Sequence, residues 1–178
     1  RGFKVIIPLK TAQELLRILN NGTVTIFIDS NQILFKDEDL EVISRLVNGS
    51  YPDYELIIPK SLATEMVLER EHLLNAAKLV SNFSGKTNEV RIKLKDDKKF
   101  LEVYSTNQYL GESRYLIPVK AKGDDFEASF NWRYLMDGLK NFNEKEIIFG
   151  VNGDTRPAVL KSPGDFSYFY ILMPIKGS

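Results

Sequence analysis

The sequence predicts an α+β fold made of repeated βαβββ units, with antiparallel sheets on one side and paired helices on the other. Two observations predict it. Three segments have apolar residues at helical spacing, and each contains a bulky apolar pair; the pairs recur at intervals of 58 and 62 residues and are Leu15-Leu16, Leu73-Leu74 and Leu135-Met136. Strand-like segments surround each helix in the same order, one before it and about three after it. Such a repeat indicates one supersecondary unit present three times.

The expected elements follow the same order in each unit. The first unit has a strand at 3–9, a helix at 11–21 and strands at 23–29, 32–37 and 40–46. The second has a strand at 61–69, a helix at 71–82 and strands at 89–95, 99–105 and 112–119. The third has a strand at 126–131, a helix at 131–142 and strands at 146–151, 157–161 and 168–175. Val90, Ile92 and Leu94 alternate with charged residues, which is typical of an antiparallel sheet with one exposed face.

Two such units pack into one domain, so three units predict one and a half domains. The turn-prone stretch 51–54, Tyr-Pro-Asp-Tyr, is the expected break between them. We therefore expect one part over residues 1–56 and a complete domain over 57–178. Because the chain begins at Arg1 without Met or a signal peptide, we also expect it to be an internal part of a longer protein.

Composition excludes several classes of protein. No apolar run approaches the roughly 20 residues that cross a bilayer, so we expect no membrane association. The absence of Cys excludes disulfides and thiolate chemistry and fits a reducing compartment. Lys and Arg balance Asp and Glu at 24 each, so any contact with DNA must be local.

Sites for catalysis or metal binding are sparse. His72, the only histidine, lies within an expected helix, and the acidic stretches at 37–39, 96–97 and 124–125 lie in expected turns. No P-loop, Rossmann glycine pattern or G-x-S-x-G occurs. We therefore expect no catalytic residue, no metal ligand and no cofactor. An enzyme that uses a pair of carboxylates, as glycosidases do, is the less favoured alternative.

Two surfaces could bind a partner. Aligning the helices on their apolar pairs places polar residues in three columns: Gln13, Glu71 and Arg133; Arg17, Asn75 and Asp137; Asn20, Lys78 and Lys140. This face is either an ordinary exposed helix surface or one that faces DNA phosphates through water. The last strand, 168–175, is apolar on both faces, so its second face is covered either by its own domain or by a partner peptide.

Several motifs resemble one family. Ser50-Tyr51-Pro52-Asp53-Tyr54 with Ile58-Pro59-Lys60 is similar to the link between domains two and three of the bacterial DNA polymerase III beta subunit, the sliding clamp. The C-terminal stretch 170–176, the opening Val5-Ile6-Ile7-Pro8, and Phe130-Asn131 before Tyr134 are also similar in order and spacing. The resemblance implies the DNA clamp fold, with sheets outside and helices on the inner face. Residues 1–56 would then be the second half of domain 2, and 57–178 domain 3.

The resemblance also implies a function and partners. Clamp subunits close head to tail into a homodimeric ring around double-stranded DNA, without sequence preference, in the cytoplasm. They bind short motifs of the DNA polymerase III core, the clamp loader and repair polymerases. Carried over to this chain, the peptide site comprises Pro52, Leu56, Ile57, Asn131, Tyr134, Pro157, Ile171, Leu172, Met173, Pro174, Ile175 and Lys176. Leu56 stands where many members carry arginine, and a further wall lies in the front half of domain 2.

Two other surfaces follow from the same resemblance. The residues facing DNA would be Lys10, Gln13, Arg17, Asn20, Asn75, Lys78, Arg133 and Lys140. The dimer interface would include Leu79, Val80, Gln108, Glu112 and Arg114, although Leu79 and Val80 could equally be core residues. The alternative of another class is a β-rich interaction domain unrelated to DNA. The clamp assignment requires the two helices within 61–178 to lie side by side on one surface.

Overall fold

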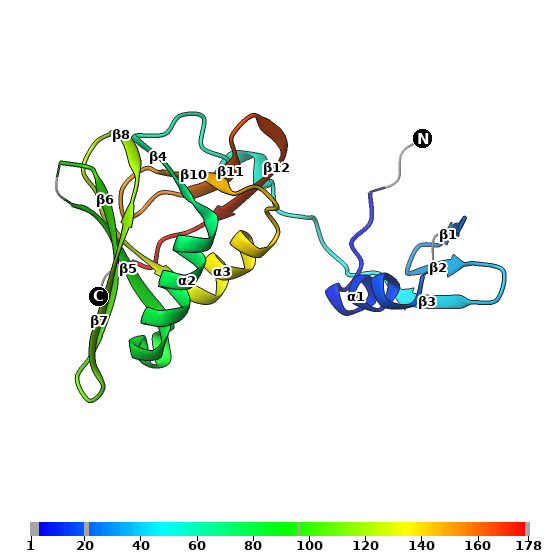
Figure 1. Cartoon of the computed structure of the whole chain (residues 1–178). Coiled ribbons are helices and arrows are strands. Elements are labelled where there is room, and N and C mark those ends of the chain that lie inside the picture. The colour runs from blue at the N-terminus through cyan, green and yellow to red at the C-terminus, as the bar shows by residue number, and fades with distance from the viewer. Residues whose placement is uncertain (1–3, 20–21, 96, 177–178) are drawn as a thin grey trace. The chain divides into compact units, whose positions relative to one another are not determined.

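The structure, a computed structural model, describes residues 4–19, 22–95 and 97–176 (Figure 1). It divides into two compact units, Arg1–Asp53 and Tyr54–Ser178. The division falls just before the short 3₁₀ helix η1 (Tyr54–Ile57), within the turn-prone stretch 51–54 that is the expected break and slightly before the expected domain bound at residue 56.

The first unit contains one helix and one antiparallel sheet. The elements are α1 (Leu9–Ile18), β1 (Thr25–Ile28), β2 (Gln32–Lys36) and β3 (Glu41–Arg45), with the strands in the order β1-β2-β3. Leu15 of α1 and Ile33 and Phe35 of β2 form its buried core. This is one αβββ half-domain.

The strand expected at 3–9 is wrong for the residues that can be described. Residues 4–8 form no strand, and Leu9 already begins α1. The Val47 amide, which follows β3, donates a hydrogen bond to the Ile6 carbonyl of this segment at 2.8 Å. Phe3 lies outside the described residues. The segment therefore lacks the ladder of hydrogen bonds that defines a strand.

The second unit contains two sheets and two longer helices. Its first half comprises β4 (Thr64–Glu69), α2 (Arg70–Val80), the 3₁₀ turns η2 (Ser81–Phe83) and η3 (Gly85–Thr87), β5 (Glu89–Lys95), β6 (Phe100–Asn107), β7 (Gly111–Pro118) and β8 (Lys120–Gly123). Its second half comprises β9 (Glu127–Asn131), α3 (Trp132–Lys140), β10 (Glu146–Val151), β11 (Ala158–Ser162) and β12 (Asp165–Leu172).

The two halves exchange strands. One sheet has the order β12-β11-β10-β4-β8 and the other β7-β6-β5-β9, all antiparallel, so each half donates the strand before its helix to the sheet of the other half. The registers correspond: Glu69, just before α2, pairs with Glu146, and Asn131, just before α3, pairs with Glu89. The halves are therefore related by a pseudo-two-fold axis.

This exchange places α2 and α3 side by side (Figure 1). The expectation that both helices lie on one surface is confirmed. Below them, Phe130 of β9 and Phe149 of β10 meet edge to face with their ring centroids 5.7 Å apart. Both rings are fully buried, and a buried side chain of this size stabilises the fold by about 1.5–3 kcal/mol.

The chain crosses between the sheets at two equivalent points, which the sequence analysis missed. After Pro118 ends β7, the chain enters the other sheet as β8, where Lys120 pairs with Val67 of β4. After Leu172 ends β12, the chain likewise crosses to β9, where the Ile175 amide donates to the Ser129 carbonyl at 2.7 Å. The expected last strand, 168–175, thus begins earlier and ends at Leu172, with only a bridge at Ile175.

Candidate functional site

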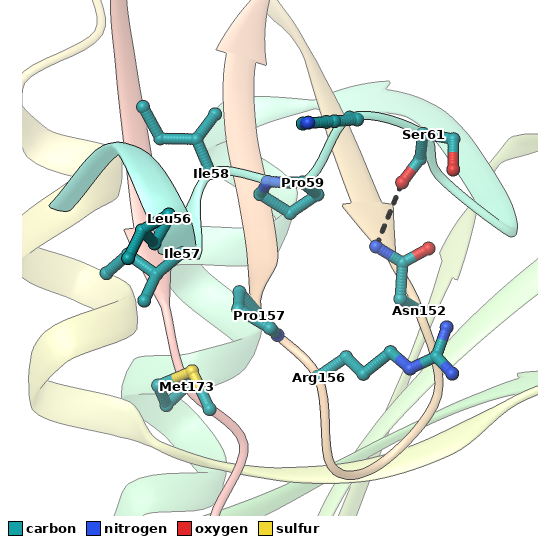
Figure 2. Close-up of a pocket in the computed structure, with 10 residues that line it drawn as sticks. Leu56, Ile57, Ile58, Pro59, Ser61, Asn152, Arg156, Pro157 and Met173 are labelled. Carbon is teal, nitrogen blue, oxygen red and sulfur yellow. Dashed lines mark hydrogen bonds between the residues drawn. The ribbon is translucent and has the colours of Figure 1, made fainter. Parts of the chain in front are cut away.

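A cavity of about 390 Å³ opens at the surface of the second unit. One wall is the segment that leads from η1 to β4, and the other consists of the turn between β10 and β11 and the residue after β12 (Figure 2). The lining residues are Leu56, Ile57, Ile58, Pro59, Lys60, Ser61, Asn152, Arg156, Pro157 and Met173. Six of these residues are apolar and are called the apolar floor, and an apolar lining with a few polar groups is typical of ligand sites.

Two contacts fix the first wall to strand β10. The Asn152 side chain accepts a hydrogen bond from the Ala63 amide at 2.7 Å and donates one to the Ser61 carbonyl at 3.1 Å (Figure 2). Leu62 packs directly on Gly150, where a Cβ atom would lie 2.4 Å from the Leu62 Cδ1 atom. Since both contacts form within the unit itself, the wall is held in place before any ligand binds.

The last strand has one covered and one open face. On the covered face, Leu172 is buried and Tyr170 packs its ring against Gly138 of α3. On the other face, Phe169 and Met173 are 44% and 54% exposed. Strand β12 lies at the edge of its sheet. Of the two alternatives for the double apolar pattern, its own domain covers one face, and the other face remains open to a partner.

The structure brings part of the expected peptide site together. Leu56, Ile57, Pro157 and Met173 line the cavity. The remaining expected residues of the second unit do not line it: Asn131, Tyr134, Ile171, Leu172, Pro174, Ile175 and Lys176. Pro52 belongs to the first unit.

Leu172 is a correction, because its side chain is in the core of the domain and cannot contact a ligand. Pro174 is also buried. Asn131 has another role, since its side chain caps α3 by accepting a hydrogen bond from the Arg133 amide at 3.0 Å.

Six lining residues were not predicted from the sequence: Ile58, Pro59, Lys60, Ser61, Asn152 and Arg156. The signal for the first wall was present, because Ile58-Pro59-Lys60 is an apolar and proline-restrained stretch next to the expected linker. No comparable signal marks Arg156, which lies in a polar turn and reaches the cavity only through the fold.

The outward faces of α2 and α3 are polar. Asn75 and Lys78 on α2 and Arg133 and Lys140 on α3 are all exposed. The Arg133 guanidinium lies 5.3 Å from the centre of the Trp132 ring, and Lys140 Nζ lies 3.9 Å from an Asp137 carboxylate oxygen. The face therefore carries cations and an amide together with the carboxylates of Glu71 and Asp137, all of which the polar columns contain.

The first unit carries the remaining residues expected to face DNA. Lys10, Gln13 and Arg17 are exposed on α1, and Arg17 forms an ion pair with Glu14 at 2.7 Å. Asn20 lies outside the described residues.

The residues expected at a dimer interface divide into core and surface. Val80 is fully buried, so of the two alternatives its side chain belongs to the core. Leu79 is 52% exposed, and Gln108 is exposed in the turn between β6 and β7. Glu112 and Arg114 form an ion pair at 3.1 Å on β7, an edge strand, and the hydrogen bond from Arg114 lowers the pKa of the Glu112 carboxyl group.

The described residues hold no group of three or more His, Cys, Asp or Glu side chains that could bind a metal ion. The His72 imidazole lies 3.9 Å from the Glu69 carboxylate and is half-buried. Asp97 is exposed in a turn, and Asp124 and Asp125 are exposed in the irregular segment between β8 and β9, while Asp96 lies outside the described residues. Within the described parts of the chain, no helix is long and apolar enough to cross a membrane.

The sequence matches two domains of one protein family. Residues 55–176 match the C-terminal domain of the DNA polymerase III beta subunit, and residues 1–53 match its central domain. The chain belongs to the DNA polymerase III beta subunit family. Its half-domain and its pseudo-two-fold domain therefore correspond to parts of two successive beta subunit domains.

Individual beta subunits are similar along nearly the whole chain. The beta sliding clamp of Bacillus subtilis is 29% identical over 181 residues, covering 99% of this chain and 48% of that protein. The beta sliding clamp of Staphylococcus aureus is 32% identical, covering 97% of this chain and 46% of that protein. The chain thus spans about half the length of the beta clamps it matches.

Solved beta subunit structures share the fold. The Bacillus subtilis sliding clamp superposes with a TM-score of 0.88 at 29% identity and covers 100% of this chain and 48% of its own. The beta subunit of Thermotoga maritima gives a TM-score of 0.86 at 25% identity, with coverage of 98% and 48%. A Pseudomonas aeruginosa sliding clamp bound to griselimycin gives 0.87 at 26% identity, with coverage of 97% and 47%.

Proposed function

We propose that this chain is the C-terminal half of a sliding clamp, which acts as a processivity factor of DNA replication in the cytoplasm and has no catalytic activity. Residues 1–56 would complete the second clamp domain, and 57–178 would be the third. The observation that carries the proposal is the exchange of β4 and β9 between the two halves, which places α2 and α3 side by side with polar outward faces. A β-rich interaction domain unrelated to DNA does not require such a helix pair.

The polar faces of α1, α2 and α3 would line the channel of a closed ring. Lys78, Arg133 and Lys140 can attract phosphates through water, while the zero net charge keeps the attraction loose enough for sliding. Since a clamp holds DNA by encircling it, the chain by itself should bind duplex DNA weakly and without sequence preference. A gel shift at physiological salt measures this, and tight binding to a linear duplex would contradict the proposal.

Ring closure would use the exposed end of α2 and the open edge of β7. Leu79 offers an exposed apolar side chain, and an edge strand offers unpaired backbone groups to a strand of a second subunit. Head-to-tail association into a homodimer would then place Glu112 and Arg114 at the interface.

The cavity would receive a short peptide motif of the DNA polymerase III core, the clamp loader or a repair polymerase. Its floor of Ile57, Pro157 and Met173 suits a leucine and an aromatic side chain. Each buried apolar anchor contributes about 1.5–3 kcal/mol, so two or three anchors support micromolar binding in an intact clamp once the cost of association is subtracted. This chain lacks the wall from the front half of domain 2 and should bind more weakly.

Met173→Ala tests the peptide site. A synthetic peptide with two leucines and a phenylalanine is titrated by calorimetry against the chain and the variant. We expect affinity to fall about 5- to 30-fold, the usual range when a central interface side chain is truncated. Phe169→Ala is the matched control, because Phe169 lies on β12 just before Met173 in the chain, is similarly exposed and does not line the cavity. Equal affinities for the chain and Met173→Ala would mean that the peptide does not bind in the cavity.

A further inference from the structure

The margin of the cavity carries charge of one sign. Eight of its ten lining residues are uncharged, and the two charged ones, Lys60 and Arg156, are both cations. The nearest acidic residues along the chain, Glu55 and Asp154, do not line it. An apolar floor with two cations at its rim is complementary to a ligand that carries apolar anchors and negative charge.

Both cations are available to a ligand. Lys60 and Arg156 are exposed, and neither forms an ion pair with a carboxylate among the described residues. Most other surface arginines of this unit already have such a partner, as Arg91 has Glu89 and Arg114 has Glu112. Among the described residues, Lys60 and Arg156 are therefore cations with no carboxylate at ion-pair distance.

The backbone presents both cations from restrained positions. Lys60 follows Pro59, and the next residue is held by the hydrogen bond from Asn152 to the Ser61 carbonyl. Arg156 precedes Pro157, which limits its own φ and disfavours helical backbone at Arg156. Figure 2 shows the Arg156 side chain extending toward Asn152 along the second wall. One cation thus stands on each wall of the cavity.

We propose that the cavity selects partner motifs in which acidic residues flank the apolar anchors, and that Lys60 and Arg156 form ion pairs with these acidic side chains. The inference rests on the proposed peptide-docking function and adds a specificity that the apolar floor cannot supply. The apolar floor argues against nucleic acid as the occupant, because DNA would leave Ile57, Pro59 and Met173 without apolar partners.

The test compares two synthetic peptides with the same anchors, two leucines and a phenylalanine. One peptide has two glutamates on each side of the anchors and the other has glutamines there. At low salt we expect the acidic peptide to bind about 3- to 10-fold more tightly, since each exposed ion pair contributes a factor of about 1.5–5. The ratio should approach one at roughly 1 M salt, where the screening length is only about 3 Å.

Variants test whether the preference for the acidic peptide comes from Lys60 and Arg156. In Lys60→Gln with Arg156→Gln, the acidic peptide should bind no more tightly than the neutral one. Lys86→Gln removes an exposed cation that does not line the cavity and should keep the preference.

The other outcomes separate the two proposals. If both peptides bind the unaltered chain equally and Met173→Ala still weakens both, the charge selection is overturned and the docking function stands. If neither peptide binds, the docking function and the charge selection are both overturned. If a duplex oligonucleotide displaces the acidic peptide and loses this ability in the double variant, the two cations bind phosphates, and the selection of acidic peptides is overturned.

Discussion

Glu127 is the centre of a cross-strand network on the sheet β7-β6-β5-β9. Its carboxylate accepts hydrogen bonds from Lys93 Nζ at 2.7 Å and from the Tyr104 hydroxyl at 2.5 Å. These bonds, that from Lys93 first, lower the pKa of the Glu127 carboxyl group below its ordinary value of 4.5. Cross-strand pairs of this kind stabilise a sheet where side chains face solvent.

The pH dependence of stability tests this network. Because folding lowers the pKa of Glu127, its contribution is present above about pH 4.5 and is lost as the pH falls through the folded-state value. Glu127→Gln should lower the free energy of unfolding at pH 7 by at most about 1 kcal/mol, since the ion pair is partly exposed. Urea titrations of both proteins should converge below pH 4.5. A difference that persists at acid pH, or in about 1 M salt, would assign the effect to packing instead.

Gly138 is needed for close packing between α3 and β12. A Cβ atom at this position would lie 2.5 Å from the Tyr170 ring. Glycine to alanine in an exposed helix stabilises by about 1 kcal/mol, but overpacking a filled site costs about 1–3 kcal/mol. We expect Gly138→Ala to destabilise the domain by that amount in urea unfolding. The same substitution in a Tyr170→Leu background should cost much less, and an equal cost in both backgrounds would contradict the packing argument.

At the scale of elements, the pseudo-two-fold extends to the start of each helix. The Arg70 amide at the start of α2 donates to the Lys145 carbonyl just before β10, at 2.8 Å. The Trp132 amide at the start of α3 donates to the Asn88 carbonyl just before β5, at 2.9 Å. The start of α2 is therefore bonded to the start of β10, and the start of α3 to the start of β5. The exchange of strands thus positions the helix pair.

The two helices differ in their caps, and this gives a prediction. The Asn131 side chain caps α3, whereas Glu69 provides no side-chain cap for α2. Asn131→Ala should cost about 1 kcal/mol in thermal or urea unfolding, and Asn131→Asp should cost little because its carboxylate can still accept the amide. Titrating the Leu- and Phe-containing peptide against Asn131→Ala also tests the expected peptide contact. A change in affinity of more than about twofold would assign Asn131 to the site as well as to the cap.

Hydrophobic periodicity predicted the elements whose pattern is local. Strand β5 agrees with its expected range, and α2 and α3 begin within one residue of theirs. Strand β8 has no apolar alternation in Lys120–Gly123, and it is a strand because the edge of β4 lies beside it. Residues 4–8 show the reverse, since an apolar stretch forms no strand without a ladder to join. A segment forms a strand only where a neighbouring strand pairs with it, so the sequence of the segment alone does not determine this.

At the scale of the whole molecule, the repeat made the fold predictable and the site only partly so. The βαβββ order indicated two halves and a shared helix surface, because secondary structure repeats along the chain. The cavity combines residues from the link before β4, the turn after β10 and the end of β12, and only the first and last carry motifs. Lys60 and Arg156 both line the cavity through tertiary structure alone, so residue patterns could not pair them.

The two units differ in the size of their cores, and this predicts different local stability. Leu15, Ile33 and Phe35 are the buried core of the first unit, whereas the second has a cluster several times larger that joins both sheets and both helices. Large apolar side chains of the first unit, such as Leu16 at 87% exposure, remain at its own surface. Little buried apolar area then opposes the opening of α1 and β1–β3.

Native-state hydrogen exchange of the 178-residue chain measures this difference. Backbone amides of β2 should exchange through openings of low free energy, whereas those of β6 and β10 should exchange only with global unfolding, because local stability follows buried contact. Val103→Ala in the larger core should speed exchange of β6 and β10 while leaving β2 unchanged. If β2 is protected as strongly as β10, or if Val103→Ala shifts both equally, the two units unfold together, and the division at residue 53 does not describe their stability.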